Sequence, residues 1–199
     1  RLGWQLAPLN TRLAAEELDT RTGRLDPELI LCGRDTEDGV AEALGSGTAA
    51  DVELLTVDEP RTRTSRALPD PDRPVRPDPH APDDTALILF TSGTTGEPKG
   101  VRLTPGNLVS SAVSSAFRLG VSPGDRWLCC LPMYHMGGLA PTVRSALYGT
   151  TLLVQREFDA DATAAVLAEE GITGVSLVPT QLSRLLDAGV DAPDLRTIL

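Results

Sequence analysis

Lysine is nearly absent from this sequence of 199 residues, and aromatic residues and long apolar runs are also scarce. Lys99 is the only lysine among 18 basic residues, and phenylalanine, tryptophan and tyrosine together make up 4% of the chain. No apolar run approaches the roughly 20 residues that a membrane-spanning helix requires. We therefore expect no membrane span.

Basic residues are also outnumbered by acidic ones, so the formal net charge is −10 and the isoelectric point is near 4.6. Non-specific binding to nucleic acid needs a basic surface, so this composition argues against that class of function. An acidic chain that uses arginine in place of lysine fits either salt adaptation or genome composition.

Cysteine occurs three times, at Cys32, Cys129 and Cys130, with no spacing typical of a metal or redox site. The odd number favours a reducing, cytoplasmic compartment. Cys129 and Cys130 lie in an apolar segment, and we interpret them as packing residues. No other side chains form a metal-ligand pattern, so we predict no protein-built metal site.

Alternating strand and helix patterns predict an α/β fold, with a doubly wound, mostly parallel sheet and helices on both faces. We expect a first α/β portion at 1–59, a connector rich in proline, arginine and aspartate at 60–84, and a second α/β portion at 85–199. The sequence begins at Arg1 without a signal-like segment and ends in what reads as an opening strand, so we expect a piece of a longer protein. The expected strands are 29–32, 52–57, 86–90, 126–131, 150–155, 172–178 and 195–199, and the expected helices are 12–18 (capped by Asn10-Thr11), 36–44, 105–119, 138–148, 159–170 and 180–188.

Glycines and hydroxyl groups concentrate at 91–100, with the sequence Thr-Ser-Gly-Thr-Thr-Gly-Glu-Pro-Lys-Gly, directly after the apolar run 86–90. Glycines let a backbone approach a ligand closely, hydroxyls donate hydrogen bonds, and Lys99 supplies a positive charge for phosphate oxygens. The loop is not a Walker A motif, because Gly100 rather than serine or threonine follows the lysine. A flexible loop with a surface lysine is the alternative, but this lysine is unique in the chain, which favours a polyphosphate site.

A second group of candidate residues is Leu131–Leu139, with the sequence Leu-Pro-Met-Tyr-His-Met-Gly-Gly-Leu, at the carboxyl end of the strand expected at 126–131. Open α/β sheets bind ligands at that end of their strands. Gly137 and Gly138 leave room beside His135, which we predict to line the site. The alternative is a packed histidine that a backbone carbonyl satisfies.

Arg144 is the third candidate, since it is the only charged residue in the segment 136–148. A buried guanidinium needs an anionic partner, which a substrate could provide. The alternative is a helix-surface arginine whose head group reaches solvent.

The loop at 91–100 resembles the signature of the adenylate-forming superfamily of acyl-CoA synthetases, luciferases and peptide-synthetase adenylation domains. A segment at 9–18, Leu-Asn-Thr-Arg-Leu followed by Glu-Glu-Leu, resembles that superfamily more weakly. The resemblance implies that the loop holds the β- and γ-phosphates of ATP while a carboxylate attacks the α-phosphate. The residues it assigns to ATP are Thr91, Ser92, Gly93, Thr94, Thr95, Gly96 and Lys99.

Four segments resemble one branch of the superfamily, the o-succinylbenzoate–CoA ligases of menaquinone biosynthesis. The branch activates the succinyl carboxylate of its substrate, while the benzoate carboxylate faces a basic residue, which Arg144 matches. The segments are Ser111–Ala116, Asp125–Leu128, Leu131–His135 and Tyr148–Thr150.

The resemblance further implies catalytic roles for Lys99 and His135, and substrate contacts for His135, Gly137, Gly138 and Arg144. The co-substrates would be ATP, with Mg²⁺ inferred from ATP, and coenzyme A; a homo-oligomer is possible. The family's ribose-binding aspartate and its C-terminal domain lie beyond Leu199, so we expect residues 1–199 alone to be inactive.

Three other functions stay open. The first is an acyl- or aryl-CoA synthetase for a different acid, such as a fatty acid or benzoate. The second is an adenylation domain that passes its acyl group to a carrier protein. The third is a non-catalytic nucleotide-binding or scaffold domain.

Overall fold

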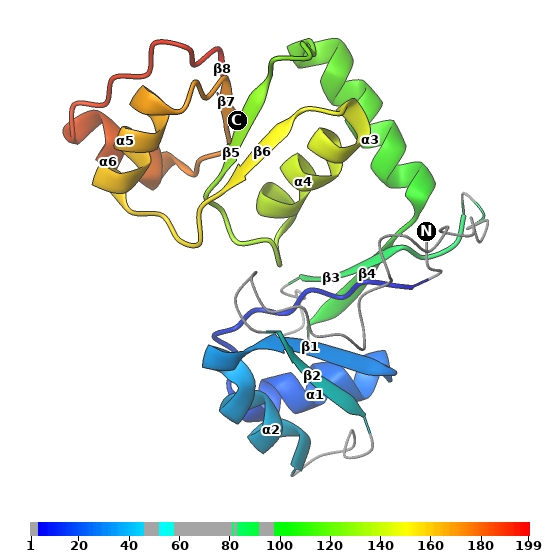
Figure 1. Ribbon diagram of the computed structural model, residues 1–199. Coiled ribbons are helices and arrows are strands. Elements are labelled where there is room, and N and C mark those ends of the chain that lie inside the picture. The colour runs from blue at the N-terminus through cyan, green and yellow to red at the C-terminus, as the bar shows by residue number, and fades with distance from the viewer. Residues whose placement is uncertain (1–3, 46–51, 58–80, 82, 92–97) are drawn as a thin grey trace. The chain divides into compact units, whose positions relative to one another are not determined.

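The computed structural model describes residues 4–45, 52–57, 81, 83–91 and 98–199 (Figure 1). The chain divides into two compact units, one of Arg1–Leu2 with Leu9–Asp78 and the other of Gly3–Pro8 with Pro79–Leu199. No helix in the described ranges is both long and apolar enough to cross a membrane.

The first unit is a strand–helix–strand arrangement preceded by a helix. It contains α1 (Ala15–Leu25), β1 (Leu29–Gly33), the short 3₁₀ helix η1 (Arg34–Thr36), α2 (Glu37–Gly45) and β2 (Glu53–Val57). β1 and β2 pair in parallel, in a register that places Leu29 opposite Glu53 and Gly33 opposite Val57. A parallel pair needs a crossover, and α2 lies within it.

The start of α1 differs from the prediction. The helix begins at Ala15 rather than Arg12, because the Asn10 side chain accepts a hydrogen bond from the Arg12 backbone N–H at 2.9 Å and holds a turn there. The Glu17 carboxylate instead accepts the backbone N–H of Ala14, at 3.3 Å. The helix then continues to Leu25, seven residues further than predicted.

The second unit contains a fully parallel four-stranded sheet in the order β6-β5-β7-β8. Its strands are β5 (Arg126–Cys129), β6 (Thr151–Val154), β7 (Gly174–Val175) and β8 (Thr197–Ile198). Its helices are α3 (Pro105–Leu119), α4 (Met136–Tyr148), α5 (Ala160–Glu169) and α6 (Pro179–Asp187). The predicted mostly parallel α/β fold is confirmed, although all four strands of this sheet are shorter than predicted.

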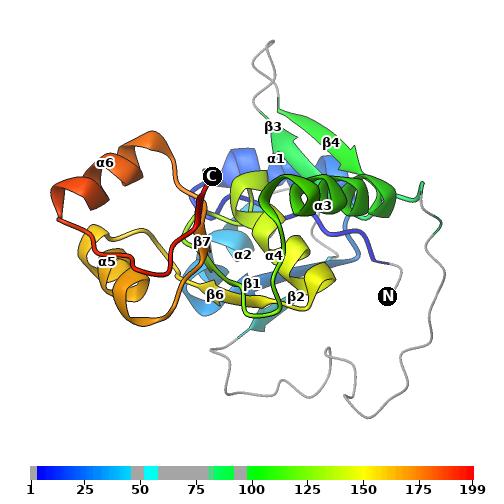
Figure 2. The ribbon, with the colours of Figure 1, turned by 90° about the horizontal axis from the view of Figure 1, so that it is seen from above.

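Helices cover both faces of this sheet, as the alternation of side chains along β5 requires. Leu128 packs with Leu167 of α5 and Leu185 of α6 in the main core cluster. The neighbouring Trp127 contacts Arg144 of α4, and the Cys129 thiol donates to the carbonyl of Gly138 on the same helix. Figures 1 and 2 show α5 and α6 on one side of these strands and α4 on the other.

A separate antiparallel hairpin joins β3 (Leu87–Thr91) to β4 (Lys99–Leu103). The N-terminal segment adds to it, since the backbone of Leu6 donates to Ala86 and accepts from Ile88, both at 2.9 Å. β4 was not predicted, because its mixture of lysine, glycine and arginine carries no periodic apolar pattern. Its strand conformation comes from pairing with β3.

The helix α3 follows the hairpin and has the predicted bounds. The Thr104 hydroxyl accepts the Asn107 backbone N–H at 3.1 Å, and the Asn107 side chain accepts the Thr104 backbone N–H at 3.0 Å. Gly120, with φ of 75°, ends the helix. These signals are local, so the sequence alone identifies both ends.

Candidate functional site

The β3–β4 hairpin holds both ends of the predicted phosphate loop. Thr91 and Lys99 are register partners at the end of the ladder where the loop leaves and re-enters the two strands, and both are exposed. Antiparallel pairing therefore sets the separation of the loop's two ends and leaves the Lys99 ammonium available to an anion. Five of the residues predicted to contact phosphate lie outside the described residues: Ser92, Gly93, Thr94, Thr95 and Gly96.

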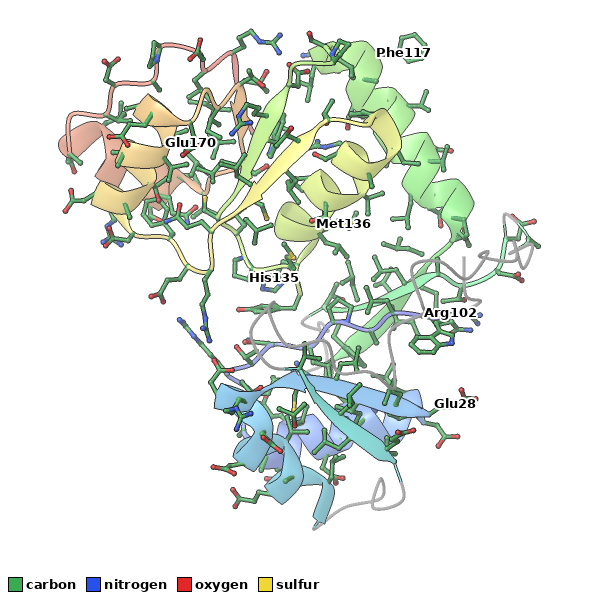
Figure 3. All side chains as sticks on the ribbon, viewed as in Figure 1. Glu28, Arg102, Phe117, His135, Met136 and Glu170 are labelled. Carbon is green, nitrogen blue, oxygen red and sulfur yellow. The ribbon has the colours of Figure 1, made fainter. Side chains whose placement is uncertain are left out.

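One apolar cluster joins this hairpin to the segment that contains His135. Leu87 and Leu89 of β3 pack with Leu139 of α4, and Met133 and Met136 pack against the same cluster. Figure 3 shows His135 and Met136 at the end of α4 that faces the hairpin. The structure thus brings together the two groups of residues that the sequence singled out.

His135 occupies the N-cap position of α4 and is exposed. Its backbone N–H donates to the Pro132 carbonyl at 3.1 Å, and its own carbonyl accepts from Gly138 and Leu139. Its ring lies 4.6 Å from the Tyr134 ring. The backbone is therefore fixed while the imidazole faces solvent, so the packed-histidine alternative does not describe this residue.

The two glycines of this segment differ in what surrounds them. A Cβ on Gly138 would lie 2.4 Å from the carbonyl oxygens of both Leu131 and Pro132, so only glycine lets α4 begin here. A Cβ on Gly137 would meet only the Leu131 side chain, at 3.2 Å. Gly138 is buried and Gly137 is exposed, so the structure gives Gly138 a packing role.

A groove of about 270 Å³ lies where β5, β7 and β8 end. Its position matches the carboxyl-terminal edge at which parallel sheets bind ligands. Both Gly137 and Arg144 line it, whereas His135 and Gly138 do not. The sequence prediction missed the Ser176 contribution, since a serine after a short strand gives no distinctive signal. Other lining residues include Leu131, Ala140, Leu177 and Leu199.

Arg144 is half-buried, and its guanidinium lies 4.6 Å from the centre of the Trp127 ring. No carboxylate lies within ion-pair distance of it in the part of the chain that the structure describes. Two other arginines of the second unit do have carboxylate partners: Arg126 contacts Glu170 at 3.2 Å, and Arg196 contacts Asp125. Burial lowers the pKa of Arg144, and the nearby Tyr148 opposes this shift. The guanidinium therefore has unused hydrogen-bond donors beside the groove.

The vicinal cysteines are buried and act as packing residues, in agreement with the prediction. The Cys129 thiol donates to the Gly138 carbonyl at 3.2 Å. Burial, with a smaller contribution from Cys129, raises the pKa of the Cys130 thiol to about 11. Neither residue has the lowered pKa that an activated nucleophile requires.

No group of histidine, cysteine or carboxylate side chains suited to a metal occurs among the residues described. Magnesium is commonly held by substrate phosphates together with one or two carboxylates. The residues present therefore fit a Mg²⁺ ion only as part of a nucleotide complex, which is the form that the sequence implies.

Comparison with known proteins places the chain in a family. The model for AMP-binding enzymes matches residues 1–199. The chain is 36% identical to a 2-succinylbenzoate–CoA ligase of Bacillus velezensis over 205 residues, covering 100% of this chain and 38% of that protein. It therefore spans well under half the length of this relative.

Solved structures show the same similarity. The inhibitor-bound N-terminal domain of FACL13 from Mycobacterium tuberculosis matches with a TM-score of 0.80 and 31% identity, over 96% of this chain and 48% of that one. The O-succinylbenzoate coenzyme A synthetase of Bacillus subtilis, in complex with ATP and magnesium, matches with a TM-score of 0.76 and 29% identity. That match covers 96% of this chain and 38% of the other.

These matches confirm the resemblance on which the sequence prediction rests. The family model extends over the loop at 91–100, the segment at 131–139 and the weaker segment at 9–18. The chain belongs to the family of AMP-binding enzymes.

Proposed function

We propose that the full-length protein is an ATP-dependent acid–CoA ligase that acts on o-succinylbenzoate in menaquinone biosynthesis. The observation that carries the choice of acid is Arg144, a charged donor beside the groove with no anionic partner among the described side chains. The name of the Bacillus velezensis relative supports the same choice.

In the first half-reaction, an oxygen of the succinyl carboxylate attacks the α-phosphorus of ATP. A new P–O bond forms, the bond to the bridging oxygen breaks, and pyrophosphate leaves with the electron pair. Lys99 and the loop hydroxyls hold the β- and γ-phosphates in line and stabilise the charge that develops on pyrophosphate. Thr91 is the register partner of Lys99 at the base of the loop, so its hydroxyl belongs to the same group of phosphate donors.

In the second half-reaction, the thiol of coenzyme A attacks the acyl carbon and AMP leaves. His135, exposed at the start of α4, borders the acyl group during both steps. Gly137 leaves open space at the groove. When bound, Mg²⁺ would neutralise part of the triphosphate charge. The reaction would take place in the cytoplasm, where the three cysteines stay reduced; all three are free in the structure.

The second carboxylate of the substrate pairs with Arg144. A guanidinium bound to a carboxylate makes two parallel hydrogen bonds, which is more specific than a point charge. Partial burial strengthens the pairing, because water screens a half-buried charge less than an exposed one. A monocarboxylic acid lacks this contact and binds more weakly.

ATP–pyrophosphate exchange on the full-length protein tests the proposal. The acids are o-succinylbenzoate, benzoate, a medium-chain fatty acid and an amino acid. We expect exchange with o-succinylbenzoate alone, and a decrease of about 10- to 100-fold for Arg144→Ala, from the loss of a charge-assisted hydrogen bond.

Arg184→Ala is the matched control, since Arg184 also lies over an aromatic ring, that of Phe158, but does not line the groove. Exchange with a monocarboxylate instead would leave an acid–CoA ligase of another specificity. Exchange with the amino acid alone would favour the carrier-protein alternative, and exchange with none of these acids would favour the non-catalytic one.

A further inference from the structure

Trp127 lies between the parallel sheet and the Arg144 guanidinium. Its register partner on β7 is Gly174. A Cβ on Gly174 would lie 2.4 and 2.5 Å from two atoms of the indole ring, so the ring extends across the backbone of that glycine. Arg144, on the helix that covers this face, lies over the same ring at 4.6 Å. Glycine, indole and guanidinium thus form three stacked layers.

This stack restricts the motion of the Arg144 guanidinium without occupying its N–H hydrogen-bond donors. A free arginine side chain loses substantial conformational entropy when it binds a ligand. A guanidinium over an indole ring interacts through its face, while its N–H groups point outward in its own plane. Those N–H groups therefore remain free for a carboxylate, and part of the ordering cost is met before the ligand arrives.

A hydrogen bond does not explain why tryptophan occupies this position. The indole Nε1 is buried, and within the described ranges it has no hydrogen-bond partner. Buried tryptophan N–H groups usually find one. The interaction that the site uses is through the flat face of the indole ring, which packs against Gly174 on one side and against the Arg144 guanidinium on the other.

We propose that Trp127 is a positioning residue, which holds the Arg144 guanidinium in the orientation that binds the second carboxylate of the acid substrate. Gly174 shares this role by leaving room for the ring. The inference rests on the proposed function of Arg144, and it adds that the specificity for a dicarboxylate depends on a residue on the sheet.

The test compares two acids on the full-length enzyme. One is o-succinylbenzoate and the other is 4-oxo-4-phenylbutanoate, which lacks only the benzoate carboxylate. For Trp127→Leu we expect the KM for the dicarboxylate to rise by about 5- to 30-fold, the range that a desolvated cation–π contact supports, with kcat and the KM for the monocarboxylate little changed. Gly174→Ala displaces the ring and shifts the KM in the same direction.

Trp127→Phe keeps an aromatic face and removes the unpartnered N–H, so we expect it to retain discrimination between the two acids. Phe158→Leu is the matched control, because it removes the ring that Arg184 covers at 5.5 Å and leaves Arg144 in place. That control should leave the ratio of the two KM values unchanged. Thermal unfolding of each variant establishes that it is folded.

The outcomes separate this inference from the function on which it rests. An equal rise in KM for both acids in Trp127→Leu, or no discrimination left in Trp127→Phe, would overturn the positioning role. If Arg144→Ala leaves the discrimination intact, the proposed role of Arg144 itself is wrong. If Arg144→Ala removes it and Trp127→Leu does not, the positioning role alone is wrong.

Discussion

Lys99 is the only lysine of the sequence, and its place at the start of β4 explains why a lysine is useful there. The ladder pairs it with Thr91, so its backbone is fixed while its side chain extends into solvent. An ammonium on a flexible four-carbon stem can follow a phosphate group through a reaction, whereas a guanidinium binds with a fixed planar geometry.

We predict that Lys99→Ala lowers the rate of ATP–pyrophosphate exchange by about 10²- to 10³-fold, as the loss of one donor to developing charge does in other enzymes. The free energy of unfolding should change little, because the side chain is exposed. Exchange kinetics and a urea titration of the full-length protein measure the two effects.

Arg102→Ala is the control for that variant, since it removes a cation three residues further along the same strand. The Nε of Arg102 donates to the Thr85 hydroxyl at 2.6 Å, so its contribution is structural. Lys99→Ala with normal exchange would contradict the assignment and favour a non-catalytic scaffold.

The element that organises the site is α4, whose first turn lies against the 131–132 backbone at Gly138. We predict that Gly138→Ala destabilises the protein by about 1–3 kcal/mol, as overpacking of a buried site does. The added methyl would meet two carbonyl oxygens, so the helix has to move. A urea titration with a fixed m-value measures the change.

Gly137→Ala is the comparison at the neighbouring position. Its methyl would meet only the movable Leu131 side chain, so we expect a smaller loss of stability. If the two variants are equally stable, crowding against the 131–132 backbone does not explain why position 138 is a glycine.

Elements with signals in their own residues were predictable, and elements made by distant contacts were not. Thr104 and Gly120 bound α3, and both are visible in the sequence. β4 depends on pairing with β3. β7 has two residues, which are defined by their pairing with β5 and β8. Local chemistry identifies caps and turns, whereas pairing decides where a short strand begins and ends.

The same distinction holds for the site. His135, Gly137 and Arg144 were predicted from a motif and from isolated charge, and the structure places Gly137 and Arg144 on one groove. The layer of Trp127 over Gly174 could not be predicted, because it depends on the register between β5 and β7. Forty-seven positions separate these residues in the sequence, and no local pattern links them.

At the scale of the whole molecule, the chain covers 38% of the Bacillus velezensis relative, so most of that protein has no counterpart in it. We predict that residues 1–199, expressed alone, form no thioester from o-succinylbenzoate, ATP and coenzyme A. The full-length protein, assayed in parallel, should form it. Circular dichroism establishes that the shorter protein is folded.

Measurable thioester formation by residues 1–199 would contradict this expectation. It would mean that the phosphate loop, the His135 segment and the groove suffice for both half-reactions. Binding of ATP without turnover would agree with the prediction.

The helix α4 carries His135 at its start and Arg144 nine positions later. An α-helix rises 1.5 Å per residue, so the two positions are spaced by roughly 13 Å along the axis of one helix. On the proposed function, α4 therefore fixes the distance between two contacts: His135 borders the activated end of the acid, and Arg144 binds its second carboxylate. Acids would be sorted by the distance between their two ends as well as by their charge.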